Sequence, residues 1–182
     1  MFKRILVALD GSAASNAGFK SALQLAGDEH AMLAGLHVLD DSSVTLNFEG
    51  AYVPAPYVDK LFQSLRQRGR EILKQAEAVA KTAGVDMQPV LVESRGQTIA
   101  QTILAQARKA KADVIVIGTH GRRGLSRVLM GSDAEAVVRE SPVPVLLVRA
   151  SESAPAKPRA KKAASANEKR TATKRSGAAT II

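Results

Sequence analysis

A glycine-rich stretch in the second half of the chain carries the residues best suited to bind a phosphate group. Three glycines and a serine follow the spacing Gly118-x2-Gly121-x9-Gly131-Ser132. The stretch follows an apolar run of strand character and leads into a helical pattern. Glycines allow positive φ angles and the close approach of a ligand, and the N–H groups at a helix start attract anions. The sequence therefore predicts a phosphate-binding loop.

The loop also carries three positive side chains, Arg122, Arg123 and Arg127. Each of them is suited to contact phosphate, although a solvated charged face explains any single one equally well. The two common phosphate-binding motifs are absent. The chain has no Gly-Lys pair of the Walker type, and no Gly-x-Gly-x-x-Gly follows its first apolar run.

The composition excludes several classes of protein. The 182 residues are 46% hydrophobic and include no cysteine, which excludes disulfides and thiolate chemistry. The apolar run at the N-terminus is too short for a signal peptide, and no run approaches the ~18 apolar residues of a membrane span. We therefore expect a soluble, cytoplasmic protein without a membrane partner.

The net charge of +9 is concentrated at the C-terminus. Residues 151–182 hold eight Lys and Arg residues against two glutamates and show no apolar periodicity. We predict a folded nucleotide-binding domain at 1–150 and a disordered basic tail at 151–182. Such a tail suits non-specific binding to nucleic acid or to an acidic partner, although a merely solubilising extension is an equally good interpretation.

Apolar runs alternate with helical patterns along the first 150 residues. Expected strands lie at 3–9, 31–39, 87–92, 113–117 and 143–149, and expected helices run from Ser12 or Ser15 to Gly27 and over 59–83, 98–111 and 133–140. This alternation predicts an α/β fold with a parallel sheet. The longest helix is expected to bury Leu61, Leu65, Ile72, Ala76 and Val79. The connection at 40–58 is long enough to be a lid or a partner surface.

The glycine spacing, together with Pro142-Val-Pro144 and a final apolar strand, resembles the ATP-binding members of the universal stress protein family. The resemblance covers about residues 1–149. It implies a single doubly wound, mostly parallel five-stranded sheet in the order 3-2-1-4-5, a Rossmann-like fold of the HUP type. In such a fold a crevice opens at the carboxyl ends of strands 1 and 4, and ligands bind there.

The resemblance also implies which residues bind ATP. Asp10 would hold the ribose hydroxyls or the adenine edge, Val38 and Ile117 would line the base, and Ser132 would contact the β- or γ-phosphate. Each also has a simpler interpretation: Asp10 as a turn residue, Val38 as core, Ser132 as a helix N-cap. The full predicted nucleotide site is Ala8, Leu9, Asp10, Val38, Ile117, Gly118, His120, Gly121, Arg122, Gly131, Ser132 and Asp133.

Two of these residues need separate comment. His120 is common in the family and would face the phosphates, but a general acid needs a partner base and the sequence names none, so a structural role is favoured. Asp133 departs from the family pattern, and its carboxylate would repel phosphate unless Mg²⁺ bridges the two. We expect no protein-only metal site, because His30, His37 and His120 lack ligand spacing.

The expected function is that of an ATP-binding universal stress protein, acting with Mg²⁺ as a regulatory or protective homodimer. The family implies pairing through the last strand, Val143–Val148. No paired carboxylates and no nucleophile–base set are present, so at most a weak ATP hydrolysis is expected. The alternatives are a slow ATPase and a stress protein that binds no nucleotide and associates with nucleic acid through its tail.

Overall fold

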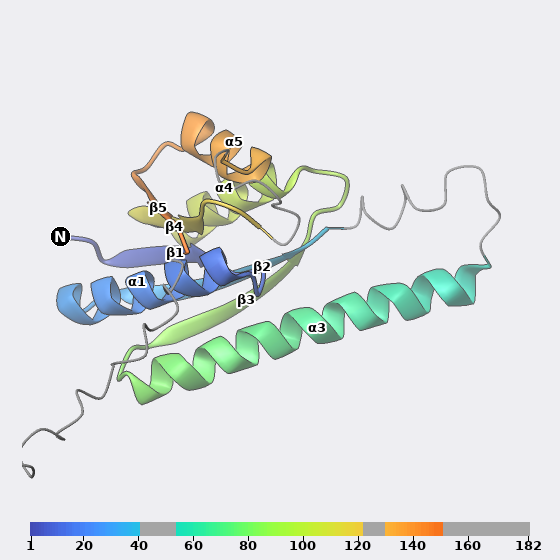
Figure 1. Cartoon of the computed structure of the whole chain (residues 1–182), viewed down its shortest axis with the longest axis horizontal. Coiled ribbons are helices and arrows are strands. Elements are labelled where there is room, and N and C mark those ends of the chain that lie inside the picture. The colour runs from blue at the N-terminus through green and yellow to red at the C-terminus, as the bar shows by residue number, and fades with distance from the viewer. Residues whose placement is uncertain (41–53, 122–129, 151–182) are drawn as a thin grey trace, which may run out of the picture. The chain divides into compact units, whose positions relative to one another are not determined.

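The computed structural model describes residues 1–40, 54–121 and 130–150. They form an α/β fold around a five-stranded sheet in the order β3-β2-β1-β4-β5, in which every neighbouring pair of strands is parallel (Figure 1). The predicted fold class and strand order are confirmed. The elements are β1 Arg4–Ala8, α1 Ala13–Glu29, β2 Met32–Leu39, α3 Ala55–Thr82, β3 Met87–Glu93, α4 Ile99–Ala110, β4 Val114–Gly118, α5 Ser132–Glu140 and β5 Val145–Val148.

Helices cover both faces of the sheet. Helices α1 and α3 pack on one face, and α4 and α5 pack on the other (Figure 1). The central strands β1 and β4 supply side chains to both layers: Ile5 and Val7 pack on the α1 and α3 side, whereas Leu6 packs against α4. Burial on both faces explains why these strands are continuous apolar runs in the sequence.

Polar residues fix the starts of two helices. The hydroxyl of Ser12 accepts the N–H of Ser15 and caps α1, as one of the two sequence alternatives predicted. Helix α4 begins with a capping box: Thr98 Oγ1 accepts the N–H of Gln101, and Gln101 Oε1 accepts the N–H of Thr98. Both helices therefore leave the carboxyl end of a strand at a defined residue.

Three sequence predictions about the helices are wrong. Helix α3 begins at Ala55 and not at Asp59. Gly27 does not end α1, which continues to Glu29 and closes on the left-handed residue His30. Val79 is not on the buried side of α3, because its side chain is 52% exposed, whereas Leu73 and Ala80 are buried. At ~100° per residue Val79 lies about 80° away from Gly69, which is buried at the centre of the packed face.

Asp113 ties the amino end of β4 to the segment that leads into β1. Its Oδ2 accepts the N–H groups of Lys3 at 2.7 Å and Arg4 at 2.8 Å. These hydrogen bonds stabilise the charged form and hold the pKa of the Asp113 carboxyl below its ordinary value. The two strands that frame the site are thus aligned from their amino ends.

No described helix, the 28-residue α3 included, has a stretch long and apolar enough to cross a membrane.

Helix α3 packs closely against the sheet at Gly69. A Cβ at Gly69 would lie 2.7 Å from both His37 Cδ2 and Leu91 Cδ1. Gly27, also in a helix, has no atom within 4 Å of its would-be Cβ. Substitutions of these two glycines by alanine therefore form a matched pair. Helix propensity favours alanine at both positions, but only at Gly69 would the added methyl group clash.

Gly69→Ala is expected to destabilise the protein by about 1–3 kcal/mol, since the methyl group overpacks the contact with His37. Gly27→Ala is expected to leave stability unchanged or to raise it by about 0.5–1 kcal/mol. Urea unfolding followed by circular dichroism measures both. Equal effects of the two substitutions would contradict a close contact between α3 and the sheet at Gly69.

Candidate functional site

A pocket opens at the carboxyl ends of β1 and β4, where the chain reverses its winding direction. Helix α1 leaves β1 toward one face of the sheet, and α5 lies on the other face. The pocket has a volume of about 350 Å³. This is within the range of small-molecule sites, roughly 300–1,000 Å³.

The pocket collects the predicted site residues that the structure describes. Its wall includes Ala8, Leu9, Asp10, Val38, Ile117, Gly118, His120, Gly121, Gly131, Ser132 and Asp133. The remaining predicted residue, Arg122, lies outside the described residues, as do Arg123 and Arg127. Residues far apart in the sequence therefore share one cavity.

One part of the pocket wall is apolar. It is built by Leu36 and Val38 of β2, Ile99 and Ile103 of α4, and Ile117 of β4. Leu36, Ile103 and Ile117 are buried, whereas Val38 and Ile99 are partly exposed. Branched aliphatic side chains from three elements make a surface suited to a flat apolar ring.

Another part of the wall is the start of α5. Gly131 is the N-cap residue and Ser132 is the first residue of the helix. No side chain of the described residues caps it. Ser132 is therefore not the N-cap. The Gly131 N–H donates to the carbonyl of Thr119 at 2.9 Å, which fixes the two ends of the glycine-rich stretch to each other. The first N–H groups of a helix carry partial positive charge and favour an anion.

Gly118 has a structural reason to be glycine. A Cβ there would lie 2.7 Å from the backbone carbon of Ala14 and 2.8 Å from the backbone nitrogen of Ser15. Among the described glycines, positive φ angles occur only at Gly11, Gly84 and Gly96. Positive φ is thus not what selects Gly118, Gly121 or Gly131, and at Gly118 the reason is the contact with α1.

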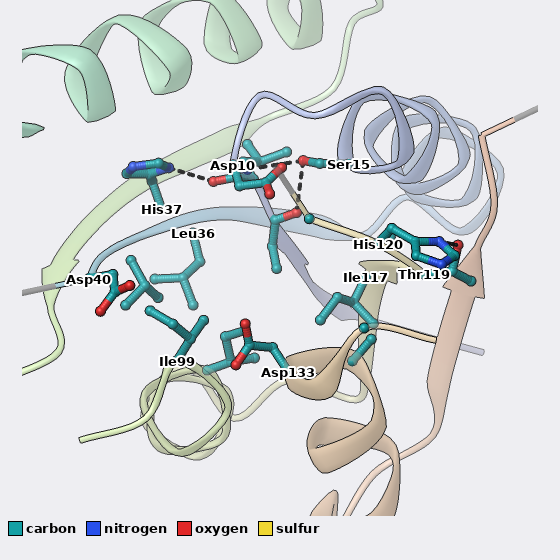
Figure 2. A pocket seen from close by; sticks show the side chains of 18 of the residues that line it. Asp10, Ser15, Leu36, His37, Asp40, Ile99, Ile117, Thr119, His120 and Asp133 are labelled. Carbon is teal, nitrogen blue, oxygen red and sulfur yellow. Dashed lines mark hydrogen bonds between the residues drawn. The ribbon is translucent and has the colours of Figure 1, made fainter. Parts of the chain in front are cut away.

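The turn after β1 is held by its own hydrogen bonds. Asp10 Oδ1 accepts the N–H of Ser12 at 2.8 Å, and the Asp10 N–H donates to Ser15 Oγ at 3.1 Å. Ser15 Oγ donates in turn to the carbonyl of Ala8 at 3.2 Å (Figure 2). Ser12 Oγ donates to the carbonyl of His120 at 3.3 Å. Asp10 is therefore a turn residue and a pocket residue at once.

Two histidines line the pocket. His37 is buried, and its Nδ1 lies 2.5 Å from the carbonyl of Leu9, so Nδ1 must carry the proton because a carbonyl only accepts. His120 is partly buried; its Nδ1 lies 3.1 Å from Thr119 Oγ1, and its Nε2 is buried without a hydrogen-bond partner among the described residues. His37 is a fixed part of the wall, whereas the ring of His120 lies beside Thr119 (Figure 2).

Three carboxylates surround the pocket, those of Asp10, Asp40 and Asp133 (Figure 2). No Lys or Arg of the described residues lines it. The described residues also contain no group of three or more His, Cys, Asp or Glu side chains placed to hold a metal ion. Any phosphate at the start of α5 would therefore have Asp133 beside it.

Several lining residues were missed by the sequence predictions: Ser15, Leu36, His37, Asp40, Ile99, Ile103, Thr119 and Ala134. Asp40 follows β2 as Asp10 follows β1, so the same signal could have found it. The two isoleucines of α4 had no such signal, because only the packing of α4 over β1 and β2 brings them to this edge.

Comparisons with known proteins find one family, by sequence and by structure. The profile of the universal stress protein family matches residues 1–149. The universal stress protein MJ0531 of Methanocaldococcus jannaschii is 34% identical over 150 residues, covering 82% of this chain and 83% of that protein. A solved structure from the universal stress protein family of Burkholderia pseudomallei is 33% identical, with a TM-score of 0.64 over 80% of this chain and 95% of its own.

Two further solved structures are described with nucleotides. A universal stress protein in complex with cAMP is 24% identical, with a TM-score of 0.56, and covers 82% of this chain and 98% of its own. A universal stress protein from Archaeoglobus fulgidus in complex with dAMP is 21% identical, with a TM-score of 0.54, and covers 80% and 97%. At this identity both share the fold. Family profile, sequence relatives and fold coincide, and the chain belongs to the universal stress protein family.

Proposed function

We propose that the chain binds ATP together with Mg²⁺ in the pocket at the carboxyl ends of β1 and β4. We further propose that it acts in the stress response as a nucleotide-dependent regulatory or protective homodimer. The observation that carries the proposal is that the pocket wall joins an aliphatic surface to an uncapped helix start. An adenine ring fits the first, and phosphate oxygens fit the N–H groups of the second.

Other features of the pocket give each part of the nucleotide a partner. Asp10 offers carboxylate oxygens to ribose hydroxyls, and Val38 and Ile117 offer apolar contact to the base. Ser132 offers its hydroxyl to a phosphate. Family members described with cAMP and dAMP support an adenine nucleotide as the ligand class.

The role of Mg²⁺ follows from the charges of the wall. A triphosphate beside Asp133 and near Asp10 would be repelled unless a cation lies between them. Because the described residues form no metal site of their own, Mg²⁺ would arrive bound to the phosphates. The side chain of Asp133, on the first turn of α5, is the candidate to share it.

Ser132→Asp separates binding from folding. A carboxylate on the first residue of α5 interacts favourably with the helix dipole, so stability should stay the same or rise. The same charge repels phosphate, so affinity for Mg²⁺-ATP should fall at least about tenfold in a calorimetric titration. Gly118→Ala is not a substitute, because its methyl group would collide with α1.

Ser64→Asp is the matched control, since it adds the same charge at an exposed position of α3, away from the pocket. It should bind Mg²⁺-ATP as the wild type does. Wild-type protein that is folded and gives no heat with millimolar Mg²⁺-ATP would refute the nucleotide proposal. If Ser132→Asp and Ser64→Asp bound Mg²⁺-ATP with equal affinity, the phosphates would not lie at the start of α5.

The proposed homodimer forms through β5. This strand is paired only with β4 in the described chain, and Leu146 on it is 39% exposed. Pro144 lies immediately before the strand and has no N–H to donate to a partner strand. A paired edge would therefore use Val145–Val148. The predicted range Val143–Val148 is thereby shortened at its start.

Leu146→Glu is expected to shift the protein from dimer to monomer in sedimentation velocity at micromolar concentration, because the like charges of two copies would meet at the edge. Val79→Glu places the same charge at an exposed apolar position of α3 and should remain a dimer. A wild type that sediments as a monomer would contradict pairing through β5.

A second proposed function rests on the basic pairs Lys161-Lys162, Lys169-Arg170 and Lys174-Arg175, all outside the described residues. The full chain is expected to retard duplex DNA of any sequence on a gel at 50 mM salt and much less at 200 mM, as neutralisation of ~5 phosphates implies. A 1–150 truncation, checked for its fold by circular dichroism, should not retard it. Equal retardation by the truncation would refute a role of the tail.

A further inference from the structure

Among the described residues β3 pairs only with β2, so its other edge is free, at the opposite side of the sheet from β5. A second cavity, of about 640 Å³, lies along this edge, and we name it the β3-edge groove. Helix α3 contributes to one wall and α4 to the other, with the end of β3 and the following turn between them. The groove is lined by Leu39, Arg66, Arg70, Leu91, Val92, Glu93, Ser94, Arg95, Gln97, Thr102, Ala105, Gln106 and Lys109.

Backbone groups of β3 that have no partner among the described residues face this groove. The Ser94 N–H donates to the Leu39 carbonyl and the Asp86 carbonyl accepts the Leu33 N–H, so the even-numbered residues of the strand face β2. In a parallel strand the intervening residues point the other way, which directs the N–H and C=O groups of Leu91 and Glu93 to the open edge. Pro89 has no N–H and limits pairing to this end.

The side chains around the edge are mostly positive. Arg66 and Arg70 come from α3, Arg95 from the turn after β3, and Lys109 from α4. Arg66 pairs with Glu93 through its Nε at 2.8 Å and its Nη2 at 2.7 Å. Within the described residues the exposed side chains of Arg70, Arg95 and Lys109 have no carboxylate partner, so the groove carries an excess of positive charge on both walls.

The positive charges of the groove indicate which kind of molecule can bind there. A second copy of the chain would bring its own Arg70, Arg95 and Lys109 against the same residues, and like charges facing each other oppose self-pairing. A compact anion would use the charges but leave the edge groups of Leu91 and Glu93 unused. An extended acidic segment uses both, since main-chain pairing and alternate side chains are recognised together in strand addition.

We propose that the β3-edge groove binds an acidic, extended peptide segment of another protein, which adds a strand beside Leu91–Glu93. The acidic side chains of the segment contact Arg70 and Arg95 on one side and Lys109 on the other. This surface is separate from the nucleotide pocket, so the two proposals stand or fall independently.

The test uses a fluorescein-labelled decapeptide in which Glu-Glu and Val-Val pairs alternate, so that an extended strand carries Glu on both faces. It is titrated with the full-length protein at 150 mM salt and followed by fluorescence anisotropy. The Arg70→Glu/Lys109→Glu variant should bind at least about tenfold more weakly than the wild type. The Arg68→Glu/Arg108→Glu variant reverses two exposed charges on the same helices outside the groove, and it should bind as the wild type does. The basic tail is the same in all three proteins, so its contribution cancels.

Two further measurements decide the mode of binding. The peptide should slow hydrogen exchange at the amides of Leu91 and Glu93, and a version N-methylated at alternate residues should bind about tenfold more weakly. Equal binding by the two charge-reversed variants would overturn the proposal. Binding by the N-methylated peptide as strong as by the parent would also overturn it, because charge alone would then account for the affinity.

Discussion

The contact between Gly118 and the first turn of α1 is the constraint on which the site depends. A side chain at residue 118 would collide with the backbone of Ala14 and Ser15, so only glycine lets the end of β4 lie directly against the helix that follows β1. Ser12 then reaches the carbonyl of His120, and the carboxylate of Asp10 lies beside Gly121. The turn after β1 and the loop after β4 are thereby held as the two sides of one pocket.

The strand order follows from patterns visible in the sequence together with the family resemblance, whereas details of packing do not. Continuous apolar runs marked β1 and β4 as strands buried on both faces. Val79 was misassigned because an apolar residue near the edge of a helical stripe is indistinguishable from one inside it until the neighbouring strand is in place. Gly69 was missed for the converse reason, since a residue without a side chain leaves no mark in an apolar pattern even when it packs closely against the sheet.

The candidate site was predictable where residues follow strands directly. Asp10 and Gly118 lie at strand ends, and the topology brings such ends together. Ile99 and Ile103 were not predictable, because their place depends on how α4 packs across β1 and β2. The motif glycines were selected in part because glycine permits positive φ angles, yet none of the three has one, and at Gly118 the contact with the backbone of α1 requires glycine.

The two edges of the sheet differ in chemistry, and this difference assigns them separate roles in our account. The edge at β5 is apolar and suited to a copy of the same chain, whereas the edge at β3 is flanked by Arg70, Arg95 and Lys109 and suited to an acidic segment. The central claim, however, concerns the pocket between them. Its most direct test is an amide chemical-shift map of the ¹⁵N-labelled full chain titrated with Mg²⁺-ATP. The account predicts that the amide signals of Val38, Ile117, Gly131 and Ser132 shift, while the signals of residues in the β3-edge groove do not change. A titration in which none of these four signals shifts would contradict it.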